Sequence, residues 1–260
     1  MSSSAFFFSA WDWKPSVVAG CLALIAVYAF LMRRRFSARA AAWMGAVTLI
    51  LLALVSPLDV LADNYLFCLH MTKHILFVLV IPALLLMGLP PEVGPRFLRR
   101  LTIPPAVSWA AGIGVMAVWH IPRLFNAALA SEPLHIAEHL SLLAGGTLYW
   151  WPVFSPFREL RLSPVPQAAA YLFTSCLACT SIGIVITFAP VLLYPAYAHP
   201  ADAYGILATI RNQWGISPGL DQQIGGLLMW VPCCLVYLAA TLAMFARWYG
   251  REDSDFVVEA

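Results

Sequence analysis

Seven long runs of apolar residues, separated by short polar or proline-containing stretches, are the feature that most limits what this chain can fold into. A helix needs about 20 apolar residues to cross the hydrocarbon core of a bilayer. Of the 260 residues, 62% are hydrophobic and only 11% are charged, which is outside the usual range of soluble domains. The sequence therefore predicts an all-α integral membrane protein, a bundle of seven transmembrane helices that forms a single domain over residues 1–260. The expected spans are residues 15–32, 40–56, 65–89, 105–121, 133–153, 165–189 and 221–248.

The basic residues predict how these spans are oriented. Seven crossings place successive connections on alternate sides, and 11 of the 15 Lys and Arg residues fall on one side. Cytoplasmic loops are the ones rich in Lys and Arg, so we expect the N-terminus outside and the C-terminus in the cytoplasm. The segment before the first span lacks the basic region and the cleavage site of a signal peptide, and we expect it to be retained, with Trp11 and Trp13 at the membrane interface. The net charge of +2 is too small to indicate a nucleic acid partner.

Histidines recur at a spacing that suits a shared ligand. His70 and His74, and again His135 and His139, are four residues apart, so each pair lies on one face of its helix. His120 ends the fourth span, and the predicted topology places all of these side chains near the outer surface. Ionisable residues inside membranes are costly and are usually functional. We therefore predict a metal site built from these five histidines; a packing role is the alternative, and for His120 taken alone both interpretations stay open.

Three further residues are candidates for a supporting role. Glu138 lies beside His139, and Asp221 begins the last span, so either carboxylate could orient an imidazole from outside the ligand shell. For Asp221 the simpler interpretation is a helix N-cap. Met71 offers a soft thioether, which would suit reduced copper, although a methionine in a span is more often an apolar filler. Lys73 would repel a cation and is not counted as a ligand.

The six cysteines do not have the pattern of a disulfide framework. Cys176 and Cys179 can share a helix face, but they lie near the middle of the membrane, below the histidines. We interpret them as small apolar residues. Neutral imidazole suits copper, zinc and iron, so the histidines alone do not identify the metal.

Several sequence blocks, taken together and in order, resemble the multi-span CtaG family of cytochrome c oxidase assembly factors. The resemblance extends from the third expected span to the end of the chain. Its blocks are His70–His74 leading to Leu84–Pro90, Val118–Pro122, His135–His139 with Tyr149–Pro152, Thr187–Pro190 with Leu193–Pro195, and Asp221–Pro232.

This resemblance implies a multi-pass protein of the bacterial plasma membrane that acts as a chaperone in assembly of the respiratory chain. It implies copper handling on the outer side, with His70, His74, His120, His135 and His139 as ligands and Asp221 as a supporting residue. The implied partners are a periplasmic copper donor and haem-copper oxidase subunits, and a homo-oligomer is compatible with the pattern. On this hypothesis the chain binds and transfers copper and is not an enzyme.

Two other classes of protein fit the histidines. A membrane zinc hydrolase would use three histidines on zinc, an open position for water, and Glu138 or Asp221 as the base. A haem-binding electron carrier would use histidines from facing helices as axial ligands. A scaffold that binds partners through the same surface, without a metal, is the remaining alternative.

Overall fold

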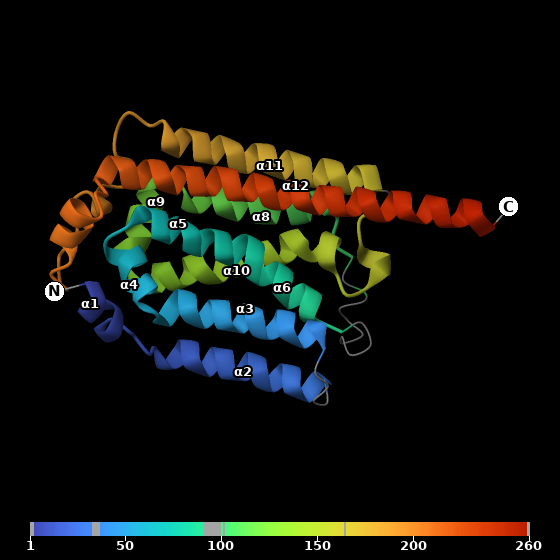
Figure 1. Ribbon diagram of the computed structural model, residues 1–260, viewed down its shortest axis with the longest axis horizontal. Helices are drawn as coiled ribbons and strands as arrows, with labels where there is room; N and C mark the ends of the chain where they lie inside the picture. Colours follow the sequence, from blue (N-terminus) through green and yellow to red (C-terminus); the bar gives the residue numbers. More distant parts are fainter. Residues whose placement is uncertain (1–2, 33–36, 91–99, 101, 164, 259–260) are drawn as a thin grey trace.

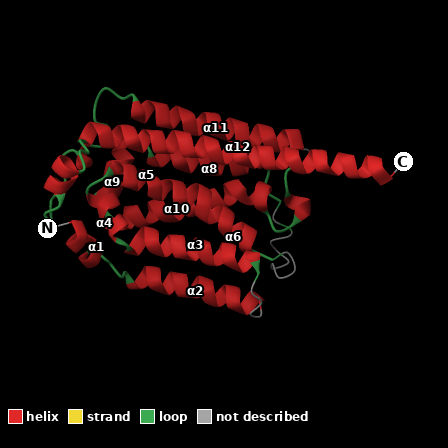
Figure 2. Cartoon of the chain, viewed as in Figure 1, coloured by secondary structure: helices red, strands yellow, loops and turns green. Residues whose placement is uncertain are grey.

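The protein is a bundle of helices lying side by side. The computed structural model describes residues 3–32, 37–90, 100, 102–163 and 165–258, and these residues contain helices and no strand (Figure 2). The long helices follow the longest axis of the molecule (Figure 1). They are α2 (Pro15–Met32), α3 (Ala38–Val55), α8 (Pro105–Trp119), α10 (Glu132–Phe154), α11 (Val165–Thr187) and α12 (Pro218–Val258). Helices α5 (Phe67–Ile75) and α6 (Ile81–Gly88) are shorter, and together with the turn between them they form one 22-residue segment, Phe67–Gly88.

Short helices that the sequence did not predict gather at one end of the bundle. Figure 1 shows α1, α4 and α9 at the end near the N-terminus, whereas the C-terminus lies at the opposite end. These helices are α1 (Ser3–Ser9), α4 (Pro57–Asn64) and α9 (Pro122–Leu129). The connection between α11 and α12 adds a 3-10 turn at Pro195–Tyr197 and a π-helical turn at Thr209–Gln213. Another 3-10 turn covers Arg158–Leu160.

Each of the seven expected spans corresponds to a helix, but helix length and hydropathy alone support four membrane crossings. The four segments that are long and apolar enough are Ala38–Val55, Phe67–Gly88, Val165–Thr187 and Pro218–Ala246. The apolar parts of α2 and α8 are shorter, and α10 carries carboxylates and imidazoles in its first turns. Five of the arginines used to predict the orientation, Arg33, Arg34, Arg35, Arg96 and Arg99, lie outside the described residues.

Large apolar side chains on the outer helices point away from the bundle. Phe30 on α2 is 84% exposed, Val185 on α11 is 64% exposed and Leu235 on α12 is 61% exposed. Exposed apolar residues of this kind, repeated on several helices, are expected where lipid rather than water surrounds the protein.

Glycines allow the helices that carry the histidines to pack closely. A side chain at Gly146 would collide with the backbone of Val78, where α10 crosses the π-helical turn Leu76–Val80 between α5 and α6. A side chain at Gly225 would collide with the ring of Phe67, where α12 crosses the start of α5. Pro82 lies near the start of α6, and the structure places the π-helical turn directly before that helix, which accommodates the missing backbone N–H.

Candidate metal centre

All five predicted histidine ligands converge at the end of the bundle where the short helices gather. His70 and His74 lie on α5, His120 is the C-cap of α8, and His135 and His139 lie in the first turns of α10. Neighbouring rings are separated by 4.4 to 5.6 Å between centroids in the pairs His135–His139, His70–His74, His74–His120 and His70–His135. The sequence-predicted cluster therefore exists as a contiguous group of imidazoles from three helices.

One donor group, whose members are fully buried, consists of His70, His74 and Glu138. The Nε2 atoms of the two histidines are 3.0 Å apart, Glu138 Oε1 is 3.2 Å from His74 Nε2, and Glu138 Oε2 is 3.8 Å from His70 Nε2. Ligands at about 2.0–2.1 Å from a tetrahedral ion lie roughly 3.3 Å apart from one another. These three side chains thus already stand at the spacing that a bound ion requires.

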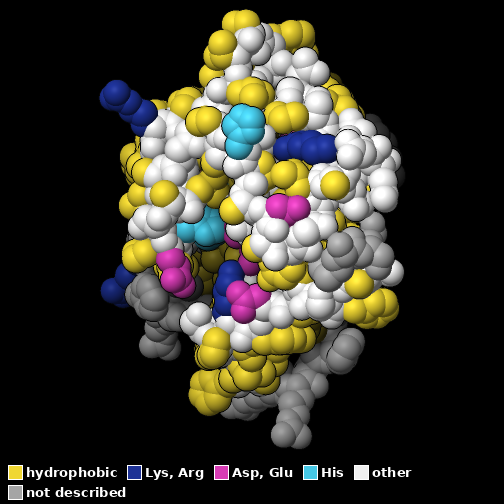
Figure 3. Space-filling view, turned by 90° about the vertical axis from the view of Figure 1, so that its left-hand side faces the viewer, with side chains coloured by type: hydrophobic (Ala, Val, Ile, Leu, Met, Phe, Trp, Pro, Cys, Tyr) yellow, Lys and Arg dark blue, Asp and Glu magenta, His cyan; other side chains and the backbone are white. Residues whose placement is uncertain are grey.

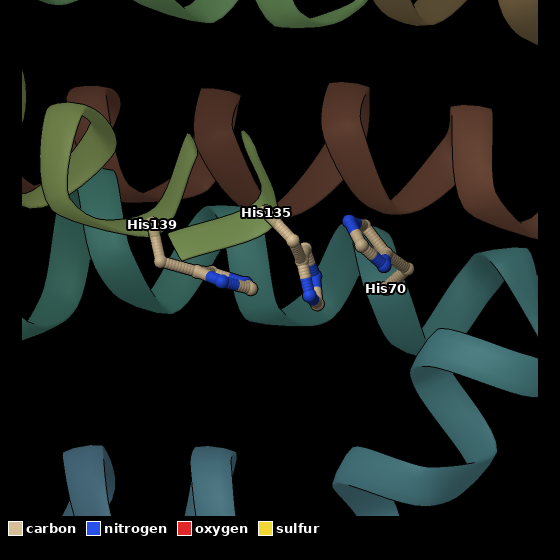
Figure 4. Close-up of side chains that lie close together, drawn as sticks. All are labelled: His70, His135 and His139. Atoms are coloured by element: carbon tan, nitrogen blue, oxygen red, sulfur yellow. The ribbon is translucent and has the colours of Figure 1, made fainter. Parts of the chain in front are cut away.

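A second donor group shares His70 with the first. The ligand nitrogens of His70, His135 and His139 lie within 4.8 Å of one another. Figure 4 shows these three rings gathered between α5 and α10. His135 is 19% exposed, whereas His70 has no exposed surface, so the second group reaches outward from the first.

Several donor atoms in this cluster are buried without a hydrogen-bond partner. Among the described residues, none bonds to His74 Nδ1, His139 Nε2, His135 Nε2 or either carboxylate oxygen of Glu138. A buried polar atom left unsatisfied costs about 1–3 kcal/mol, so such atoms are rare in native proteins. The donor set fits a metal ion, which would satisfy several of these atoms at once.

His120 extends the cluster on its inner side. Its Nδ1 is 2.6 Å from the carbonyl oxygen of Met116, which fixes the ring, and its Nε2 is 3.2 Å from Met71 Sδ. The predicted supporting residue Met71 therefore lies beside His120, and its thioether is fully buried. Nitrogen and sulfur donors side by side suit a soft ion.

A network of charged residues adjoins the cluster, and sequence reasoning missed its acidic members. Lys73 Nζ lies 2.6 Å from Asp59 Oδ1 and 2.7 Å from Asp63 Oδ1, and Lys14 Nζ lies 2.8 Å from Asp59 Oδ2. Asp63 Oδ1 is also 3.2 Å from His70 Nδ1. Asp63 is therefore the link between the ion pairs and the imidazoles, and its partly exposed carboxylate faces the outside.

This network reduces the repulsion that Lys73 would exert on a cation. Two ammonium groups, Lys14 and Lys73, stand against four carboxylates, those of Asp12, Asp59, Asp63 and Glu138, so acidic groups outnumber basic groups here. Figure 3 shows acidic, basic and imidazole side chains around a hollow at this end of the molecule.

The sequence did contain a signal for the acidic members of this network. Asp59 and Asp63 are four residues apart, which places both on one face of the short helix α4.

The sequence suggested that Asp221 is the N-cap of the last span, and the structure shows that it is not. It lies inside α12, which begins at Pro218, and its carboxylate accepts hydrogen bonds from the backbone N–H groups of Phe67 (2.8 Å) and Cys68 (2.9 Å). These N–H groups are unpaired donors at the start of α5. Asp221 therefore supports the helix that carries His70 and His74 through backbone N–H groups, and not through an imidazole.

The connection between α11 and α12 covers the cluster. Tyr194 stacks on Phe67 with 4.4 Å between ring centroids and donates a hydrogen bond to the carbonyl of His120. Tyr197 donates a hydrogen bond to the carbonyl of Ala62, and burial raises the pKa of its phenol well above the usual value. The sixth histidine, His199, lies in the same connection and is exposed.

Comparison with known proteins agrees with this arrangement of sequence blocks and helices. No curated protein and no solved structure matches the chain at a significant level. The family model described as cytochrome c oxidase caa3 assembly factor (Caa3_CtaG) matches residues 23–251, which include every helix of the candidate metal centre. The chain therefore belongs to the Caa3_CtaG family of cytochrome c oxidase assembly factors.

Proposed function

We propose that this protein binds copper at the outer end of a seven-span bundle and delivers it to a cytochrome c oxidase during assembly. Family membership supports the role in oxidase assembly. The observation that supports the copper role is the convergence of buried, unpartnered imidazoles and a buried carboxylate, with donor spacings of 3.0 and 3.2 Å. Groups of this kind are unfavourable in a membrane protein unless they bind something.

The softness of the donors favours Cu⁺ as the cargo. Imidazole binds copper and zinc alike, but the buried thioether of Met71 beside His120 is a donor that soft ions prefer.

The donors form a row that leads inward from the exposed end. Asp63 and His135 are partly exposed, His70 and His74 are buried behind them, and His120 lies beyond His74. Neighbours in this row are close enough to replace one another as ligands. Transfer by ligand exchange requires such a row, because the ion then never loses all of its ligands at once.

The membrane placement is part of the same proposal. The chain is one domain that crosses the bacterial plasma membrane seven times, with the cluster on the outer side, where a periplasmic donor and an oxidase subunit can reach it. The seven helices and the excess of basic residues in the opposite connections support this orientation. The protein acts without catalytic turnover.

The geometry argues against the two alternative chemistries. In a zinc hydrolase Glu138 would act as a base from outside the ligand shell, yet its carboxylate stands at ligand spacing from His74. A haem would need facing axial histidines with room for a porphyrin between them, whereas the closest imidazole nitrogens belong to one helix face and are 3.0 Å apart.

Metal analysis of the purified protein tests this proposal. Detergent-solubilised protein is loaded with Cu⁺ under reducing conditions, and its copper content and affinity are compared between the wild type and His70→Ala/His74→Ala. The matched control is His199→Ala, which removes an exposed histidine of the same end of the molecule. We expect imidazole-bound copper in the wild type and the control, and a loss of about 100-fold or more in affinity in the double variant.

A cellular measurement tests the delivery step. Cells that carry the double variant should contain oxidase with less copper than cells with the wild type or His199→Ala, at equal levels of the membrane protein. Zinc in place of copper in the purified protein would support the hydrolase, and a Soret band would support the haem carrier. Wild-type protein that binds no metal would overturn the copper proposal.

A further inference from the structure

Four cysteines form a second cluster, on helices α11 and α12. Cys176 and Cys179 are three residues apart on α11 and lie on one face of that helix. Cys233 and Cys234 are neighbours on α12, which packs along α11. Two adjacent helices thus bring four thiols together, and all four are free.

The thiols are paired across the two helices. Cys176 Sγ lies 2.8 Å from Cys234 Sγ, and Cys179 and Cys233 are neighbours across the same pair of helices. Cys233 and Cys234 are consecutive in the helix and point in different directions, so the four sulfurs cannot all surround one point. The cluster therefore offers two-sulfur sites, each with one ligand from α11 and one from α12.

Two hydroxyl groups lie close to the sulfur atoms of the cluster. Thr180 Oγ1 is 3.2 Å from Cys234 Sγ, and the phenol of Tyr237 is 3.7 Å from Cys179 Sγ. Hydroxyls can donate to a thiolate and stabilise its charge in a membrane interior. Helices α11 and α12 pack closely beside the thiols, because Gly183 on α11 leaves room for Trp230 on α12; a side chain at Gly183 would collide with Trp230.

The thiol cluster is too far from the histidines to share an ion with them. Asp221 marks the level of the start of α5. Cys233 lies twelve residues further along α12, about 18 Å of helix rise, whereas His74 lies seven residues beyond Phe67 along α5, about 10 Å of rise. The thiols therefore lie about 8 Å deeper than the deeper histidine of α5. Any ion bound by the cysteines would occupy a separate site, deeper in the bundle.

We propose that Cys176 and Cys234 bind a second soft monovalent ion, Cu⁺. Thiolate sulfur prefers Cu⁺ among the common cellular metals, and this ion accepts two ligands, whereas a structural zinc site takes four in a tetrahedron. On binding, one thiol loses its proton to the buffer and becomes the thiolate ligand, while the other remains a neutral donor. The copper–thiolate unit is then electrically neutral, which a low-dielectric membrane interior requires.

Copper stoichiometry in matched cysteine variants tests this site. Anaerobically reduced protein in detergent is titrated with Cu⁺ in the presence of a competing chelator, and the sulfur and nitrogen neighbours of copper are measured by X-ray absorption. The variants are Cys176→Ser/Cys234→Ser and, as a control, Cys21→Ser, which removes a buried cysteine on α2, outside the cluster and outside the histidine site. Serine is close to cysteine in size, and gel filtration with thermal unfolding shows whether each variant is folded.

We expect the wild type and the control each to bind one copper ion per chain more than Cys176→Ser/Cys234→Ser. This additional copper should have sulfur neighbours, and its binding should release about one proton. This result is independent of the histidine site, because copper bound there has nitrogen neighbours and persists in the cysteine variant. Equal copper content in the folded wild type and Cys176→Ser/Cys234→Ser would overturn the proposal. So would zinc bound in preference to copper at these thiols, or copper with nitrogen neighbours alone.

Discussion

The carboxylate of Asp221 accepts a hydrogen bond from the backbone N–H of Phe67, with 2.8 Å between Oδ2 and N. The two residues are 154 positions apart, and their contact joins the last helix to the helix that carries His70 and His74. A capping carboxylate supplied from a different helix fixes both the start of α5 and its position against α12. We expect the candidate metal centre to depend on this contact, although the partners of Asp221 are backbone N–H groups and not imidazoles.

Replacing Asp221 by Ala should therefore weaken both stability and metal binding. The loss of two buried hydrogen bonds should cost about 2 kcal/mol, and Asp221→Asn, which keeps one carbonyl acceptor, should cost less. Thermal unfolding in detergent and copper titration measure the two effects. Unchanged copper affinity in folded Asp221→Ala would mean that the cap does not position the histidines.

Asp63→Asn should lower the affinity for copper without disrupting the fold. Its carboxylate lies beside His70 and His135, and loss of such a supporting group typically reduces metal affinity about 10- to 100-fold. The control is Asp12→Asn, which changes an exposed carboxylate 3.9 Å from Lys14. Equal affinities in the two variants would show that Asp63 does not contribute to the site.

Lys73→Met should have opposite effects on stability and on affinity. Removing the buried ammonium leaves Asp59 and Asp63 without their shared partner, which should destabilise the fold by about 3 kcal/mol. The same change removes a positive charge near the imidazoles and should raise affinity for a cation roughly tenfold. Lys73→Arg keeps the charge and should change affinity far less. A fall in copper affinity in folded Lys73→Met would contradict the proposed electrostatic role.

Tyr197→Phe tests the connection that covers the cluster. The variant loses the hydrogen bond to the Ala62 carbonyl and should be less stable by about 1 kcal/mol at neutral pH. Burial raises the pKa of Tyr197 in the folded protein, so the folded state keeps a proton that the unfolded state releases above about pH 10. The stability of the wild type should therefore fall as pH rises above that value, and its advantage over Tyr197→Phe should shrink. Parallel pH profiles for the two proteins would exclude this effect.

Gly225→Ala tests the close approach of α12 to α5. The added methyl group would collide with the ring of Phe67, and overpacking of this kind costs about 1–3 kcal/mol. Gly219→Ala is the matched control on the same helix, because nothing lies within 4 Å of a side chain at that position. The control substitution should leave the stability of the protein unchanged or raise it slightly. If Gly225→Ala also left the stability unchanged, the ring of Phe67 would be able to move aside at no cost in free energy.

The sequence by itself determined the helices and the identity of the imidazole cluster. Apolar runs of sufficient length have to be helical in a membrane, because every backbone N–H must be paired within its own segment. The four-residue spacing places His70 with His74, and His135 with His139, whatever the surrounding fold. These predictions depend only on local geometry, and the structure has the helices and places each pair on one helix face. That the two pairs and His120 meet at one end of the bundle follows from the packing of α5, α8 and α10.

Only the tertiary structure decided which other residues join the cluster. Asp63 contacts His70 because the short helix α4 folds back against α5, and Asp221 reaches Phe67 because α12 packs beside α5. The same packing brings Cys176 to Cys234 across two helices. Contacts between distant segments depend on the packing angle and rotation of whole helices, and these are set by the complementarity of side chains such as Gly225 and Phe67, which no local pattern in the sequence encodes.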